Sequence, residues 1–168
     1  FKNWISGNNC YMVSYKDIMP VTDGLYLDLF KPQSKIQKDI DAFTNRFSSH
    51  TVGFHIRRTD HVAAIQNSPI ELFIEAADKE ISTHDDTKLF LASDSTEVKD
   101  ILKKRYGNRL ITNTGKTSRD SASGISDGIT DMWSLASTKK IYGSCQSTFS
   151  IAAAQIGSVP IDILSLQD

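Results

Sequence analysis

The stretch that decides the fold is TVGFHIRRTDH, which runs from Thr51 to His61. Its first six residues are mostly apolar or β-branched, a pattern typical of a buried strand. Concentrated charge follows at once, with two adjacent arginines flanked by His55 and His61. Strands of globular domains usually end in turn residues. This ending therefore indicates that the strand delivers charged side chains to a site.

Apolar runs and amphipathic stretches alternate in the rest of the chain. Further strands are predicted for the short apolar runs at 88–93, 109–113, 140–144 and 160–164. Helices are predicted between them, at 67–82, at 94–108, around 129–136 and at 148–157. Strands that alternate with helices predict an α/β fold, a Rossmann-like parallel sheet with helices on both faces.

Local signals predict how some of these segments begin and end. Ser68 and Glu71 flank a proline in the way of a capping box, which would open the helix at 67–82. The stretch 114–128 is rich in Ser, Gly and Thr and is predicted to be a long loop.

The chain is predicted to have two parts, an N-terminal segment at 1–50 and a Rossmann-like domain at 51–168. The N-terminal segment would be linking chain and a helix that packs on the domain. That helix is expected over 32–47, and one face of it carries Ile36, Ile40, Phe43 and Phe47. Residues 10–15, CYMVSY, have strand character.

Composition limits the classes of function. The chain has 168 residues, 39% hydrophobic and 23% charged, as expected of a globular domain. The net charge of −1 argues against a nucleic-acid or anionic-membrane partner. No apolar run is long enough for a transmembrane segment. Two cysteines are too few for a disulfide scaffold, and the expected location is cytoplasmic, or the secretory-pathway lumen in a eukaryote.

Ligands of open parallel sheets bind at the carboxyl ends of the strands. Because side chains alternate along a strand, His55 and Arg57 should share one face, and Arg58 should point to the other. The planar fork of an arginine matches phosphate or carboxylate oxygens. Two alternatives are open: Arg58 or Arg57 forms an internal ion pair with Asp60 or Asp94, and His55 is a hydrogen-bonded interior histidine.

The stretch GSCQSTFSIAA, residues 143–153, points to the same kind of ligand. Small hydroxyl residues before an alanine-rich helix place free backbone N–H groups at a positive helix end, a natural phosphate site. Ser147 and Thr148 could add hydroxyl donors, and the alternative is that Ser147 simply caps the helix. The acidic pair in DID, 39–41, lies on a predicted helix at a spacing that does not bring the two together, so no metal site is predicted.

Four motifs together resemble the fucosyltransferase superfamily, which includes α-1,2-, α-1,6- and protein O-fucosyltransferases and bacterial nodulation enzymes. They are VGFHIRRTD at 52–60, FLASDS at 90–95, DMWSLASTKKIYG at 131–143 and SCQSTFSIAAAQIG at 144–157. The resemblance implies the nucleotide-binding half of a GT-B glycosyltransferase that transfers fucose from GDP-fucose to a glycan acceptor with inversion. It implies GDP-fucose as substrate, no cofactor and no required metal.

The resemblance also implies roles for single residues. The catalytic residues would be Arg57, which grips the diphosphate, and Arg58, which supports it. The donor nucleotide would be bound by His55, Asp94, Asp131, Ser147, Thr148 and Phe149.

The chain differs from the family in its length, because family members usually carry a further domain before the first motif. Here about fifty residues precede it, and the chain begins at Phe1. The chain is therefore expected to be a fragment that lacks an N-terminal acceptor domain, or a lone nucleotide-binding module. The remaining alternatives are a non-catalytic nucleotide- or phosphate-binding module, a transferase for another GDP-sugar, and a scaffold whose arginines form internal ion pairs.

Overall fold

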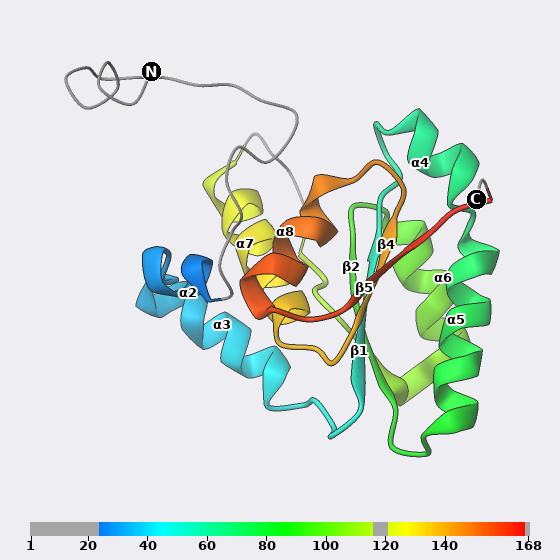
Figure 1. Ribbon diagram of the computed structural model, residues 1–168, viewed down its shortest axis with the longest axis horizontal. Helices are drawn as coiled ribbons and strands as arrows, with labels where there is room; N and C mark the ends of the chain where they lie inside the picture. Colours follow the sequence, from blue (N-terminus) through cyan, green and yellow to red (C-terminus); the bar gives the residue numbers. More distant parts are fainter. Residues whose placement is uncertain (1–23, 116–120, 167–168) are drawn as a thin grey trace, which may run out of the picture.

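The computed structural model describes residues 24–115 and 121–166, so the strand expected at 10–15 lies outside the described residues. Five strands form one sheet in the order β3-β2-β1-β4-β5, and every neighbouring pair is parallel (Figure 1). The strands are β1 (Thr51–Ile56), β2 (Lys88–Ser93), β3 (Leu110–Thr112), β4 (Ile141–Ser144) and β5 (Ile161–Leu164). The predicted strands and the predicted Rossmann-like α/β class are confirmed.

Helices cover both faces of the sheet (Figure 1). Helices α5 (Ile70–Thr83) and α6 (Thr96–Tyr106) pack on one face. Helices α3 (Ser34–Thr44), α7 (Ala122–Ala136) and α8 (Thr148–Gly157) pack on the other. The shorter elements are α2 (Leu25–Leu29), α4 (Val62–Asn67) and the single turn η1 (Gly107–Arg109). Within the described ranges, no helix combines the length and the apolar character needed to cross a bilayer.

The central strand β1 is buried along its whole length, and its alternation decides where the site can form. Val52, Phe54 and Ile56 join the core under α5 and α6. Gly53 points the other way, where an added Cβ would lie 2.8 Å from the side chain of Leu135 on α7. His55 follows Gly53 by two residues, so its side chain points to the side of the sheet that α7 and α8 cover.

The predicted helix in the N-terminal segment forms as α3 and packs in the same layer as α7. Its apolar face reaches the sheet through Phe43 and Phe47, whose ring centroids lie 5.7 and 5.6 Å from that of Phe90 on β2. Ile40 is buried on the same face. These contacts make α3 part of the layered core.

The predicted capping box is wrong. Helix α5 begins after Pro69 without a side-chain cap. The Ser68 hydroxyl instead donates to the carbonyl of Leu164 at 2.5 Å and accepts the backbone N–H of Cys145 at 2.8 Å. A buried hydroxyl that can satisfy two backbone groups of other elements contributes more than one local cap, because those groups would otherwise be buried without partners.

The prediction of a loop over 114–128 is also wrong in part. Helix α7 begins at Ala122, and the Ser121 hydroxyl caps it by accepting the N–H of Gly124 at 3.1 Å. The Ser- and Gly-rich composition conceals this first part of the helix, because serines and glycines have low helix propensity. Tertiary packing overrides that propensity, since α7 packs along α8 and α3.

Candidate functional site

A cleft of about 860 Å³ lies at the carboxyl ends of β1, β2 and β4, with α7 and α8 as walls. It opens between β1 and β4, where the strand order changes direction, and this is where ligands bind in open α/β sheets. Its volume falls in the range of small-molecule sites, about 300–1,000 Å³. Seven of the eight predicted site residues line it, namely His55, Arg57, Asp94, Asp131, Ser147, Thr148 and Phe149.

Hydroxyl groups of both neighbouring strands fix the end of β1. The Ser144 hydroxyl on β4 accepts the backbone N–H of Arg57 at 3.0 Å and lies 3.2 Å from the carbonyl oxygen of His55. On the other side, the Ser93 hydroxyl on β2 donates to the carbonyl of Ile56 at 2.7 Å. The backbone that carries His55 and Arg57 is therefore held rigidly at the cleft.

The Arg57 guanidinium forms ion pairs with Asp60 and Asp94, the latter at 2.9 Å. Asp94 is fixed in place, because its carboxylate also accepts the Arg58 backbone N–H and the Thr59 hydroxyl, each at 2.8 Å. The Asp94 side chain is 10% exposed, whereas that of Asp60 is 55% exposed. Asp94 therefore orients the arginine, and Asp60 covers it from the solvent side.

Arg58 is the one predicted site residue that does not line the cleft. Its guanidinium donates to the carbonyls of Arg57, at 2.8 Å, and Ser68, at 2.9 Å. The alternative in which the Arg58 side chain pairs with Asp60 or Asp94 is wrong, since only its backbone N–H contacts Asp94. Arg58 thus supports the backbone of Arg57 from outside the cleft.

His55 is buried beneath the cleft, and its ring stacks on Phe149 with centroids 4.7 Å apart. Burial lowers the pKa of His55 to about 4, the nearby Asp94 opposes this shift, and Arg57 adds to it. The imidazole is therefore neutral at physiological pH. Its Nδ1 atom has no hydrogen-bond partner among the described residues, so the alternative of a satisfied interior histidine is wrong.

Asp131 on α7 is the second buried polar group of the cleft, with an exposed fraction of 2%. Within the described part of the chain, its Oδ1 atom has no hydrogen-bond partner. Burial raises the pKa of Asp131 to about 7, although the Lys99 ammonium partly opposes this shift. Asn113 provides one hydrogen bond to the carboxyl group, but a buried carboxyl oxygen without a partner is costly, so Oδ1 is poised to accept a hydrogen bond from a ligand.

The start of α8 forms another wall of the cleft. Ser147 precedes the helix but makes no side-chain capping hydrogen bond, so the alternative of a simple serine cap is wrong. The preceding residue, Gln146, has a φ of 54°, an unfavourable left-handed conformation for a side chain of this kind. This turn aims the first N–H groups of α8 at the cleft, where the helix dipole attracts anions.

Sequence reasoning missed several residues that line the cleft, namely Thr59, His61, Gly124, Gly128 and Met132. His61 also caps α4, because its Nδ1 atom accepts the N–H of Ala64 at 3.1 Å. Gly124 and Gly128 are spaced four apart, which puts them on one face of α7 and leaves room in the cleft. That spacing was the signal in the sequence that could have identified them.

Comparisons with known proteins are informative only at the level of structure. No protein-family model and no curated protein sequence matches the chain. The α-1,6-fucosyltransferase NodZ soaked with GDP-fucose superposes with a TM-score of 0.60 at 24% identity, over 81% of this chain and 46% of that one. NodZ from Bradyrhizobium, as its selenomethionine form, gives a TM-score of 0.59 at the same identity and coverage.

The fucosyltransferase POFUT1 in complex with GDP superposes with a TM-score of 0.56 at 15% identity, over 78% of this chain and 46% of that one. The chain thus spans less than half the length of the solved structures it matches. In its sheet and covering helices, the chain has the same fold as the matched part of these solved structures.

Proposed function

We propose that the chain is the donor-binding part of a fucosyltransferase and holds GDP-fucose in the cleft. One observation carries this proposal: a guanidinium, an uncapped helix start and two buried polar atoms without described partners line a single cleft. The helix start and the two buried atoms lack partners without a ligand, and together with the guanidinium they suit an anionic nucleotide.

The diphosphate would lie between Arg57 and the start of α8. An anion there must replace one of the two carboxylates that now pair with Arg57. Asp60 is the more exposed of the two, and Asp94 is held by further hydrogen bonds. The phosphate oxygens therefore take the position of Asp60, while Asp94 keeps the guanidinium oriented.

The guanine base would lie against the inner wall. Guanine offers adjacent N–H donors on one edge, and the carboxylate of Asp131 can accept two hydrogen bonds. The unpartnered Nδ1 of His55 provides a further polar contact in the same cleft. These groups favour guanine over a pyrimidine base, which lacks that pair of donors.

In the transfer step, the bond between the sugar anomeric carbon and the diphosphate oxygen breaks as the acceptor hydroxyl attacks from the opposite face. The leaving GDP gains negative charge, and the acceptor hydroxyl loses its proton. Arg57 and the N–H groups of α8 stabilise the departing diphosphate, because donors fixed before the reaction need no reorganisation. These positive groups can do so without a metal ion.

The direct test of the proposal is calorimetry with GDP, GDP-fucose, GDP-mannose and UDP. We expect both GDP and GDP-fucose to bind and UDP to bind at least about tenfold more weakly, because UDP cannot satisfy Asp131. Tighter binding of GDP-mannose than of GDP-fucose would indicate another donor sugar. Failure of every nucleotide to bind would contradict the proposal.

A scaffold function is the second candidate, because Arg57 already pairs with two acidic side chains. It predicts that GDP leaves the melting temperature unchanged. Transfer itself is tested with the full-length protein and glycan acceptors. GDP binding without transfer would leave a non-catalytic nucleotide-binding module.

GDP binding is expected to strengthen as the pH rises through the pKa of Asp131, which is about 7. Below this pH the buried carboxyl is protonated and loses acceptor capacity, whereas the donors of guanine favour its ionised form. The affinity at pH 6 should be about tenfold lower than at pH 8. Calorimetry at the two pH values measures this ratio.

The control for this pH dependence is Asp131→Asn. It removes the titrating carboxyl but leaves the titration of the GDP phosphates unchanged, so its profile isolates the contribution of Asp131. Identical profiles for the wild type and this variant would show that Asp131 does not contact the base.

Asp60→Asn is expected to strengthen GDP binding by roughly twofold to fivefold, because an exposed ion pair contributes roughly 0.2–1 kcal/mol. The substitution removes the carboxylate that the diphosphate must replace. Asp85→Asn is the matched control, since it makes the same charge change at an exposed position after α5. Weaker GDP binding by Asp60→Asn, with an unchanged Asp85→Asn, would contradict this arrangement.

A further inference from the structure

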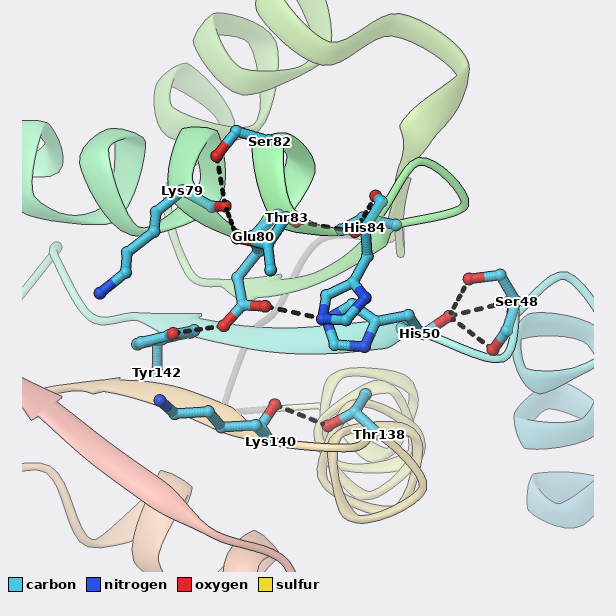
Figure 2. A network of polar contacts seen from close by, with 12 residues as sticks. Ser48, His50, Lys79, Glu80, Ser82, Thr83, His84, Thr138, Lys140 and Tyr142 are labelled. Carbon is cyan, nitrogen blue, oxygen red and sulfur yellow. Dashed lines mark hydrogen bonds and ion pairs between the residues drawn. The ribbon is translucent and has the colours of Figure 1, made fainter.

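Two histidines and a glutamate meet beside the start of β1 (Figure 2), whereas the cleft lies at the other end of this strand. His50 directly precedes β1, Glu80 lies in the last turns of α5, and His84 follows that helix. The Nε2 atom of His50 lies 2.8 Å from Oε2 of Glu80, and the two imidazole centroids are 3.7 Å apart. One ligand atom from each residue lies within 4.8 Å of the other two.

We propose that His50, Glu80 and His84 bind a divalent transition-metal ion, with zinc as the fitting member of that class. Two imidazoles and a carboxylate form a donor set that suits zinc and not magnesium. Around a tetrahedral zinc ion with bonds of about 2.0–2.2 Å, neighbouring ligand atoms lie about 3.3 Å apart. The His50–Glu80 separation of 2.8 Å is shorter than this value, and all three ligand atoms lie within 4.8 Å of one another, so the side chains must spread slightly to admit the ion.

The backbone that carries two of the ligands is held in place before any ion binds. Thr87 is fully buried, and its hydroxyl donates to the carbonyl of His84 at 2.7 Å and lies 3.1 Å from the carbonyl oxygen of Glu80. Glu80 and His84 are four residues apart, which places them on the same side of a helix end. The His50 carbonyl accepts the N–H of Lys88 on β2 at 3.2 Å, so the third ligand is also anchored.

Tyr142 orients the carboxylate of Glu80. Its hydroxyl donates to Oε1 at 2.6 Å, which leaves Oε2 turned toward His50 (Figure 2). Ligand carboxylates of metal sites are typically held by such an outer hydrogen bond. If His50 and Glu80 formed only an ion pair, a single histidine would be enough. A second histidine is present, because the exposed His84 places its ring against that of His50.

The three ligands come from the start of β1 and the end of α5, so the ion would join these elements. The position facing solvent beside His84 would be left for a water molecule, as in sites with three protein ligands. Because the donor cleft lies beyond the other end of β1, this proposal does not depend on the proposed function.

Calorimetric titration of the metal-free protein with zinc chloride tests the site. We expect one zinc ion per chain and a rise in melting temperature of about 5–10 °C at a hundred times the dissociation constant. His84→Ala, at an exposed position, should weaken zinc binding by about a hundredfold or more, since even outer-shell changes cost about ten- to a hundredfold. Glu80→Gln should have a similar effect.

Glu75→Gln is the matched control for Glu80→Gln, because it makes the same change at an exposed position of α5. It should bind zinc like the wild type, and magnesium chloride should not raise the melting temperature. Tyr142→Phe should weaken zinc binding by about tenfold by removing the bond that orients the carboxylate. Equal zinc affinity in the wild type and His84→Ala, or no binding by the wild type at micromolar zinc, would overturn the proposal.

Discussion

Arg57→Ala is expected to weaken GDP binding by about tenfold to a hundredfold, because a hydrogen bond to a charged group contributes about 1.5–3 kcal/mol. The substitution removes the guanidinium that lines the cleft and that Asp94 orients. In the full-length protein it should slow transfer by about a hundredfold or more, the usual effect of losing a donor to a developing negative charge. Calorimetry measures the first effect and a transfer assay the second.

Two control variants make this result interpretable. Arg105→Ala removes an arginine that pairs with Asp78 on the helical surface, and it should leave GDP binding unchanged. Arg57→Lys keeps the charge but loses the planar fork, so it should restore binding only in part. If Arg57→Ala lowered the melting temperature while GDP affected neither protein, the arginine would serve the fold and the donor-binding proposal would fail.

Gly157→Ala should have the largest effect on stability. A Cβ at this position would lie 2.0 Å from the carbonyl oxygen of Ala136, so α8 would have to move away from α7. Overpacking of this kind costs about 3 kcal/mol, which corresponds to a fall in melting temperature of about 6–12 °C for a protein of this size. Thermal unfolding followed by circular dichroism measures the shift.

Gly128→Ala is the control for this prediction, because no atom lies within 4 Å of the added Cβ. The residue is inside α7, where alanine is a better helix former, so the variant should be as stable as the wild type or up to about 1 kcal/mol more stable. If both variants had the same melting temperature, the contact between α7 and α8 would not limit the size of the residue at position 157.

The fold could be predicted from the sequence because its main signals are local. Each strand is a short apolar run, and helices separate the strands, which fixes a parallel sheet. The wrong predictions also relied on local signals, but contacts with residues far away in the sequence overrode these signals. Ser68 resembles a helix cap, yet its hydroxyl bonds to Leu164, 96 residues away.

The candidate site was predictable where residue type and position at a strand or helix end coincide, as for Arg57 and Ser147. The partners of Arg57 were not, because only the folded chain shows that Asp60 and Asp94 both contact it. The cluster of His50, Glu80 and His84 could not be predicted from the sequence either. His50 lies 30 residues before Glu80, and no spacing rule connects a residue before a strand to the end of a later helix.

The hydrogen bond between the backbone of Arg57 and the hydroxyl of Ser144 joins residues 87 positions apart. During synthesis, β1 therefore leaves the ribosome long before its partner β4, and one edge of a strand that is fully buried in the folded protein stays unpaired in the meantime. Such nascent chains are prone to aggregate, and slower translation lengthens their exposure. The cleft is completed last, so a ligand that binds there can protect only finished chains against misfolding.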